Sequence, residues 1–330
     1  MTTMVRLGAN GPEVFPQALG CMSMGSAGGY GASDEAESIA TIHAALDRGV
    51  NLIDTGDFYG MGRNELLVGH ALRGRRDKVL LSVKFGSLRG PDGAMLGFDA
   101  RPATTKTFLT YSLARLGVDH IDIYRPARLD PNVPIEDTIG AIAELVKAGY
   151  VRYIGLSEVG ADTIRRAAKV HPISDLQIEY SLVSRGPEAA IFPTLTELRI
   201  GVTAYGALSR GLLTGSRPRE KDLRANLPRF TAANVEKNQA IVGALARLAA
   251  ARGVTPAQLA IAWVRAKGAA QRLAVVPTIG ARTRAQLADA LAALDLTLTL
   301  DDLAAIEAEI PDAAGTRYAA QAMAHLDSER

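Results

Sequence analysis

The chain has 330 residues, 48% of them hydrophobic and 22% charged, which is ordinary globular composition and excludes a disordered or fibrous protein. Its 37 basic residues are dispersed among 35 acidic ones, without the basic stripe that nucleic-acid binding needs. No apolar run is long enough to span a membrane, and the N-terminus does not resemble a signal peptide. The single cysteine, Cys21, suits a reducing compartment, so we expect a cytoplasmic protein without nucleic-acid or membrane partners.

The first predicted elements are a hairpin and a short strand. Residues 6–15, RLGANGPEVF, contain Asn10 and Gly11, a pair that favours a type I′ turn between two antiparallel strands. The run PQALG at residues 16–20 then predicts a strand. The chain is therefore expected to begin with a β-hairpin that leads into a larger sheet.

Seven further apolar or β-branched runs follow, with helical stretches between them. The first helical stretch, residues 33–49, has Ser33 or Asp34 as its N-cap and Gly49 just past its end. The later strands are predicted at NLID (51), KVLLSV (78), HIDIY (120), VRYIGLS (151), DLQIEY (175), IGVTAY (200) and RLAVVPT (272).

Eight strands alternating with helices predict an α/β fold, a closed parallel (β/α)8 TIM barrel, because βαβ units place neighbouring strands in parallel and eight of them close the sheet. A doubly wound sheet is the rival fold. It would need a G-x-G-x-x-G turn after its first strand, and the glycines of residues 19–31 have the wrong spacing. No linker separates two units, so we expect one barrel domain over residues 1–330. Its longest irregular stretches, 85–102 and 206–235, would lie on the active-site face.

Two carboxylates and a tyrosine follow the second barrel strand in LIDTGDFYG, and Lys84 ends the third. A lysine at the end of a buried strand is costly unless it is paired, and Asp54 is the natural partner. An ammonium beside Tyr59 would stabilise its phenolate, so the phenol could donate a proton to a carbonyl oxygen. The alternative is a structural ion pair beside a core tyrosine. Asp57 is interpreted as a turn or capping residue.

Seven fragments in order resemble the aldo-keto reductase superfamily: LIDTGDFYG, GRNELLVGHAL, SLARLGVDHIDIY, YVRYIGLSEV, LQIEYSL, YGALSRGLLTG and PTIGARTRAQL. The resemblance implies a barrel that binds NADPH and reduces the carbonyl group of a small aldehyde or ketone to an alcohol by hydride transfer. It also implies that Tyr59 is the general acid, tuned by Lys84 and Asp54.

The same resemblance implies a cofactor site. Ser157 and Gln177 would hold the nicotinamide carboxamide, and Tyr205 would stack on the ring. The loop after Tyr205 would bind the pyrophosphate, and Arg282, at a place where barrels bind phosphate, would grip a 2′-phosphate, which favours NADPH over NADH. The expected cofactor-binding residues are Ser157, Gln177, Tyr205, Gly206, Leu208, Arg210, Gly280, Arg282 and Gln286.

Three positions bear on this cofactor site less directly. Glu158 stands where the family commonly has Asn, and Arg284 is a second candidate for the 2′-phosphate. Asp289 and Ala290 replace a frequent Glu-Asn pair, so one adenine contact is expected to be missing.

The clearest departure from the family is at Ala127. A histidine normally lies three residues after the tyrosine of an IDLY-like run, and IDIYRPARLDP has Ala127 there. Arg125 and Arg128 flank this position; either could lend positive charge to a developing oxyanion or could be a surface or ion-pairing residue. The alanine also opens room for a bulkier substrate or a water. A nucleotide-binding redox sensor or regulatory subunit with little turnover therefore remains the alternative function.

The substrate pocket is expected to be lined by Met24, Tyr30, Arg125, Ala127 and Arg128. No spacing of His, Cys and Asp suggests a metal site. The sequence leaves open which carbonyl compound is the substrate, the direction of the reaction, and whether the chain forms a homo-oligomer.

Overall fold

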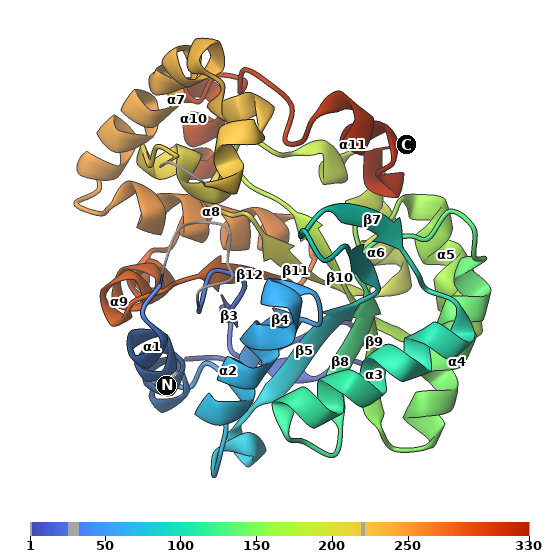
Figure 1. Cartoon of the computed structure of the whole chain (residues 1–330). Coiled ribbons are helices and arrows are strands. Elements are labelled where there is room, and N and C mark those ends of the chain that lie inside the picture. Colours follow the sequence, from blue (N-terminus) through green and yellow to red (C-terminus); the bar gives the residue numbers. More distant parts are fainter. Residues whose placement is uncertain (1, 26–32, 219–221, 330) are drawn as a thin grey trace.

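The computed structural model describes residues 2–25, 33–218 and 222–329. Eight parallel strands close into a barrel in the order β10, β11, β12, β3, β4, β5, β8 and β9 (Figure 1). The strands are β3 (Ala18–Gly20), β4 (Leu52–Gly56), β5 (Leu80–Phe85), β8 (Ile121–Pro126), β9 (Val151–Ser157), β10 (Ile173–Glu179), β11 (Gly201–Tyr205) and β12 (Val275–Gly280). All eight predicted strands are confirmed, and so is the (β/α)8 barrel over the doubly wound sheet.

Helices surround the barrel (Figure 1). They are α1 (Glu35–Asp47), α2 (Arg63–Ala71), α3 (Pro102–Leu116), α4 (Ile135–Lys147), α5 (Ala161–Val170), α6 (Ile191–Leu198), α7 (Ala232–Ala250), α8 (Pro256–Ala270), α9 (Arg284–Ala292), α10 (Leu300–Glu309) and α11 (Ala320–Ala324). The predicted start of α1 is confirmed at Asp34, whose carboxylate accepts from the Ala36 N–H at 2.8 Å.

The N-terminal hairpin pairs β1 (Val5–Arg6) with β2 (Glu13–Val14), as predicted. Its predicted type I′ turn is wrong, because Arg6 pairs with Glu13 and a longer loop separates them. The positive φ, +67°, falls at Gly8 instead. Gly11 packs so closely that a Cβ there would lie 1.6 Å from the Leu7 carbonyl oxygen.

Apolar side chains close the end of the barrel that the hairpin covers. Leu7 and Val14 of the hairpin region are fully buried and pack with Leu52, Ile123 and Val276 from three barrel strands. A much larger apolar layer lies between the strands and the surrounding helices. The barrel is thus sealed at its amino-terminal end, and polar strand-end residues are left for the opposite end.

A second hairpin, β6 (Ser87–Arg89) with β7 (Met95–Phe98), lies within residues 85–102, which the sequence predicts to be irregular. The turn between its strands contains Gly93, with φ +83°. It follows β5, so it rises at the carboxyl end of the barrel (Figure 1). In the described part of the chain, no helix is long and apolar enough to cross a membrane.

Candidate active site

Lys84 and Asp54 form a buried pair at the carboxyl ends of β5 and β4. Lys84 Nζ donates to Asp54 Oδ1, and the two residues are only 4% and 5% exposed. The other carboxylate oxygen, Oδ2, accepts from Ser82 Oγ and from Gln177 Nε2, each at 2.8 Å. Burial lowers the pKa of the Lys84 ammonium, and the charge of Asp54 opposes that effect. The pair is therefore held in one orientation by side chains from β5 and from β10, which lies across the barrel from β4.

Tyr59 begins the short 3₁₀ helix η1 (Tyr59–Gly62) directly after β4. Lys84 Nζ lies 5.1 Å from the centre of the Tyr59 ring. The turn beyond it places Gly60, Met61 and Gly62 at positive φ, which swings the chain from the strand end into α2. The structure thus brings Tyr59, Lys84 and Asp54 together, as the sequence suggested.

Asp57 joins the loops that follow β4 and β5. Its N–H donates to the Lys84 carbonyl oxygen at 2.9 Å, and its Oδ2 accepts from the Gly86 N–H at 3.2 Å. These bonds agree with the expected turn role. Burial raises the pKa of the Asp57 carboxyl to about 7.

Arg125 does not line a substrate pocket. It is fully buried and binds Asp175 through two nitrogens, at 2.8 and 3.2 Å. This geometry favours the ion-pairing role over the pocket role: side chains alternate along β8, and Arg125 faces into the barrel whereas Tyr124 faces α3. Arg128 lies just beyond the strand end, half-buried, and Ala127 beside it is 2% exposed.

Met24 and Tyr30 are the other two pocket candidates. Met24 is fully buried in the large apolar layer, where its carbonyl oxygen accepts from Asn64 Nδ2 at 3.0 Å. Its side chain therefore packs in the apolar layer behind the strand end. Tyr30 lies outside the described residues.

Three of the expected nicotinamide-binding residues end neighbouring strands. Ser157 of β9 is paired in register with Gln177 of β10, and Tyr205 ends β11. The Tyr205 hydroxyl donates to Glu158 Oε1 at 2.7 Å and lies 3.0 Å from the hydroxyl of Tyr318. The Tyr205 ring is thus fixed by a carboxylate and by the C-terminal part of the chain.

The loop after β11 has an unusual backbone. Gly206, Ser209 and Arg210 all have positive φ, at 71°, 46° and 56°, and Leu208 lies between them. Arg210 is an expected pyrophosphate ligand, yet its Nη2 already binds the buried Glu179 carboxylate at 2.8 Å. An arriving pyrophosphate would therefore share this arginine with Glu179.

The segment between β12 and α9 contains the remaining expected cofactor residues. Gly280 ends β12, and Thr283 caps α9 by accepting from the Gln286 N–H at 3.2 Å. Gln286 Oε1 in turn accepts from the Arg282 N–H at 2.9 Å. Arg284 is paired with Glu37 of α1 at 2.9 Å, so its charge is already matched.

Sequence reasoning missed the C-terminal segment, residues 315–329. Arg317 donates two bonds to Glu158, at 2.9 and 2.6 Å, and Ser328 Oγ donates a third at 2.7 Å. Burial would raise the pKa of Glu158, but Arg317 and Arg128 outweigh it and hold that pKa at about 2. The one available signal was the carboxylate at position 158, where the family commonly has an amide.

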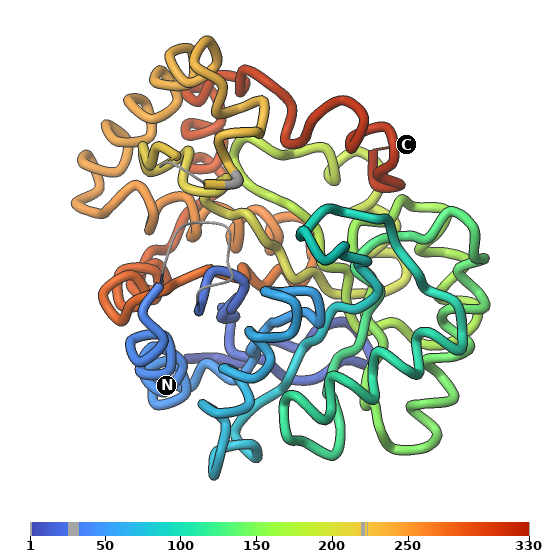
Figure 2. The backbone as a smooth tube through the Cα atoms, viewed as in Figure 1, coloured from blue at the N-terminus to red at the C-terminus, as the bar shows by residue number. Residues whose placement is uncertain are grey.

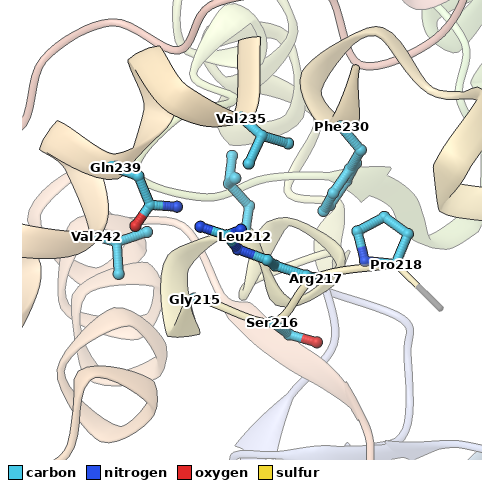
Figure 3. A pocket seen from close by; sticks show the side chains of 9 residues that line it. All are labelled: Leu212, Gly215, Ser216, Arg217, Pro218, Phe230, Val235, Gln239 and Val242. Atoms are coloured by element: carbon cyan, nitrogen blue, oxygen red, sulfur yellow. The ribbon is translucent and has the colours of Figure 1, made fainter. Parts of the chain in front are cut away.

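A small cavity lies under the loop after β11, next to α7 (Figure 3). Its volume is about 10 Å³, room for a single water. Its lining residues are Leu212, Gly215, Ser216, Arg217, Pro218, Phe230, Val235, Gln239 and Val242. The loop is therefore packed tightly on α7. In the described part of the chain, no group of His, Cys, Asp and Glu side chains could hold a metal ion.

Comparisons with known proteins agree with this geometry. The model of the Aldo/keto reductase family matches residues 18–310. A probable aldo-keto reductase 1 from Glycine max is 41% identical over 325 residues, which cover 95% of this chain and 91% of that protein. The glycerol dehydrogenase AKR11B4 from Gluconobacter oxydans has a similar structure, with a TM-score of 0.82 and 31% identity over 93% of this chain and 94% of that one. The aldo-keto reductase AKR11C1 from Bacillus halodurans gives a TM-score of 0.75 and 27% identity over 95% and 98% of the two chains. The chain therefore belongs to the aldo/keto reductase family.

Proposed function

We propose that this protein reduces the carbonyl group of a small aldehyde or ketone to an alcohol with NADPH as the reductant. The observation that carries the proposal is the buried Lys84–Asp54 pair, with Lys84 Nζ 5.1 Å from the centre of the Tyr59 ring. A phenol beside an ammonium can give up its proton near neutral pH, because the positive charge stabilises the phenolate that remains.

In this mechanism Tyr59 donates its phenolic proton to the carbonyl oxygen as negative charge develops there. Lys84 stabilises the resulting phenolate, and Asp54, fixed by Ser82 and Gln177, keeps the ammonium in place. When bound, NADPH supplies the hydride that reaches the carbonyl carbon. The reverse reaction, alcohol oxidation, would use the same groups with Tyr59 as the base.

The residues at the mouth of the barrel fit a nicotinamide dinucleotide. Tyr205 offers a ring whose hydroxyl is fixed by Glu158. Leu208 followed by Ser209 at positive φ forms the kind of concave turn that binds anions. Arg282 stands before the first turn of α9, where the helix dipole favours a phosphate. These features support NADPH as the cofactor.

A second candidate is a nucleotide-binding redox sensor or regulatory subunit with little turnover. One observation favours it: Ala127 stands, 2% exposed, where the family resemblance implies a catalytic histidine. The intact Tyr59–Lys84–Asp54 cluster favours the enzyme instead, because a sensor has no need of a tuned proton donor.

Oxidation of NADPH, followed by absorbance with a panel of aldehydes and ketones, tests the proposal. We expect steady turnover, and we expect Tyr59→Phe to lower kcat by about 100-fold or more while NADPH affinity stays nearly unchanged, since the phenol acts only once the carbonyl oxygen gains charge. Tyr111→Phe, at an exposed tyrosine of α3, is the matched control. Tight NADPH binding without turnover would favour the sensor. Near-full activity in Tyr59→Phe would show that the proton comes from elsewhere.

A further inference from the structure

Arg128 differs from the other cationic side chains near the carboxyl end of the barrel because all its hydrogen-bond partners are neutral. Its Nη1 donates to the Ala127 carbonyl oxygen at 2.7 Å and lies 3.5 Å from Ser157 Oγ, and its Nη2 lies 3.4 Å from the Tyr318 hydroxyl. Within the described residues, no carboxylate lies at ion-pair distance from it. The neighbouring cations are all paired: Lys84 with Asp54, Arg125 with Asp175, Arg210 and Arg229 with Glu179, and Arg317 with Glu158.

The charge of Glu158 reaches Arg128 only at a distance, and that carboxylate is already engaged. It accepts two bonds from Arg317, one from Tyr205 and one from Ser328. The direct hydrogen-bond partners of this half-buried guanidinium are thus all neutral, and the charge of Glu158 offsets its lost hydration only through space. An anion beside Arg128 would add charge-assisted hydrogen bonds, for which the planar guanidinium is well shaped.

Arg128 also lies close to the reacting centre. It follows Ala127 at the end of β8, and the charge of Arg128 is among those that lower the pKa of Lys84. The residue between Arg128 and the strand end is Ala127, whose methyl side chain takes up less room than an imidazole would. A substrate whose carbonyl oxygen meets Tyr59 could therefore extend over Ala127 toward Arg128.

We propose that Arg128 binds an anionic group, a carboxylate or a phosphate, carried by the carbonyl substrate. The anion would join the Tyr318 hydroxyl as an acceptor for the Arg128 guanidinium. This inference rests on the proposed carbonyl reduction and specifies its substrate class: short aldehydes or ketones that carry an acidic group a few bonds from the carbonyl. The C-terminal segment, through Tyr318, forms the opposite wall of this subsite.

Matched pairs of substrates test the proposal by kinetics. One pair is para-carboxybenzaldehyde and its methyl ester; the other is glyceraldehyde 3-phosphate and glyceraldehyde. The quantity measured is the ratio of kcat/KM between the anionic and the neutral member of each pair. We expect Arg128→Gln to lower this ratio by about 10- to 100-fold, the range of a charge-assisted hydrogen bond, and Arg128→Lys to lower it less. Arg166→Gln, which breaks the exposed pair with Glu136, should leave it unchanged.

If Arg128→Gln lowers the kcat/KM ratio for only one pair of substrates, the proposal is supported, and that pair identifies the anion as a carboxylate or a phosphate. A ratio that Arg128→Gln leaves unchanged in both pairs would overturn it, whether activity is retained or lost equally for both members. Equal loss would assign Arg128 to the reacting oxygen instead.

A binding measurement separates this inference from the proposed function. Calorimetric titration of para-carboxybenzyl alcohol into protein saturated with NADP⁺ needs no turnover. We expect Arg128→Gln to weaken that binding by about 10-fold or more, and Arg166→Gln to leave it unchanged. If no carbonyl compound is reduced and yet the carboxylate binding depends on Arg128, carbonyl reduction fails and the anion site stands. Equal binding by the wild type and Arg128→Gln overturns the anion site.

Discussion

Asp54 is the residue on which the geometry of the catalytic cluster depends most. Its two oxygens accept from Lys84, Ser82 and Gln177, which come from strands β5 and β10. Ser82 Oγ also accepts from Arg125 Nη2 at 3.2 Å, so the cluster connects to a buried ion pair inside the barrel. A buried network of paired charges is rigid, because any displacement leaves a charge without a partner. The lysine is therefore preorganised for its part in proton transfer.

Arg282 gives a test of cofactor choice at the level of one residue. We expect Arg282→Ala to weaken NADPH binding by about 10-fold or more and NADH binding far less, since only NADPH presents a 2′-phosphate for a charge-assisted contact. Arg166→Ala is the matched control, because Arg166 lies on α5 in an exposed pair with Glu136. Dissociation constants for both nucleotides can be measured by fluorescence titration. An equal loss for the two nucleotides would contradict the assignment.

The two arginines that flank Ala127 show which parts of the site the sequence could predict. Both carry the same charge, and the motif alone left both as candidates. The structure separates them by position: Arg125 lies within strand β8 and meets Asp175 inside the barrel, whereas Arg128 lies beyond the strand. That distinction depends on where the strand ends and on a partner 50 residues away, neither of which local spacing specifies.

At the scale of whole elements, the barrel strands were predictable and the C-terminal segment was not. Each strand is a compact apolar run between turn residues, so its signal is local. Arg317 holds the C-terminal segment to Glu158, 159 residues earlier in the chain. No local sequence pattern predicts such a contact. Figure 2 shows this segment running from α10 along the upper side of the view to end near α5, where Asp327 accepts from the Gly160 N–H.

Glu158 is expected to control the order of this segment. Glu158→Gln removes the charge that pairs with Arg317, and breaking a buried ion pair on one side typically costs about 3 to 5 kcal/mol. We expect faster amide hydrogen exchange in residues 315–329, with the barrel strands unchanged, because local opening there needs less free energy than global unfolding.

The control for this experiment is Glu136→Gln, which breaks the exposed pair with Arg166 and should leave exchange in the C-terminal segment unaltered. Glu158→Gln keeps a side-chain carbonyl oxygen that can accept from the Tyr205 hydroxyl, so the variant tests the loss of charge. Protection of residues 315–329 equal to that of the wild type would show that other contacts hold the segment.

At the scale of the whole molecule, apolar side chains close the amino-terminal end of the barrel. At the carboxyl end, the polar end, ion pairs attach the C-terminal segment to the barrel. The N-terminal hairpin supplies Leu7 and Val14 to the apolar end. The C-terminal segment, through Arg317, binds carboxylates on β10 and directly after β9. The two ends of the chain therefore act on opposite ends of the barrel. Buried carboxyl groups with shifted pKa values lie at the carboxyl end of the barrel, so the stability of the protein should depend on pH through them.

Asp57 is the residue at the polar end from which this pH dependence is most readily measured. Its carboxyl has a pKa near 3.8 when unfolded, and burial raises that pKa to about 7 in the folded protein. The folded state therefore binds a proton more tightly than the unfolded chain. The contribution of the Asp57 carboxyl to the free energy of unfolding is fully present below about pH 4 and is lost as the pH rises through about 7. A shift of this size corresponds to about 4 kcal/mol at most.

Asp57→Asn removes the titrating proton but keeps a carbonyl oxygen that can accept from the Gly86 N–H. We expect the variant to be more stable than the wild type at about pH 8.5 and to keep only a smaller advantage at about pH 5, where the wild-type carboxyl is neutral in the folded protein but still ionised in the unfolded chain. Urea unfolding at the two pH values measures the free energies, and Asp92→Asn, at an exposed aspartate, is the control. Glu65, whose pKa burial also raises, keeps part of the pH dependence in both proteins. The quantity to follow is therefore the difference in the free energy of unfolding between the variant and the wild type. A difference that does not change with pH would show that Asp57 is not protonated in the folded protein.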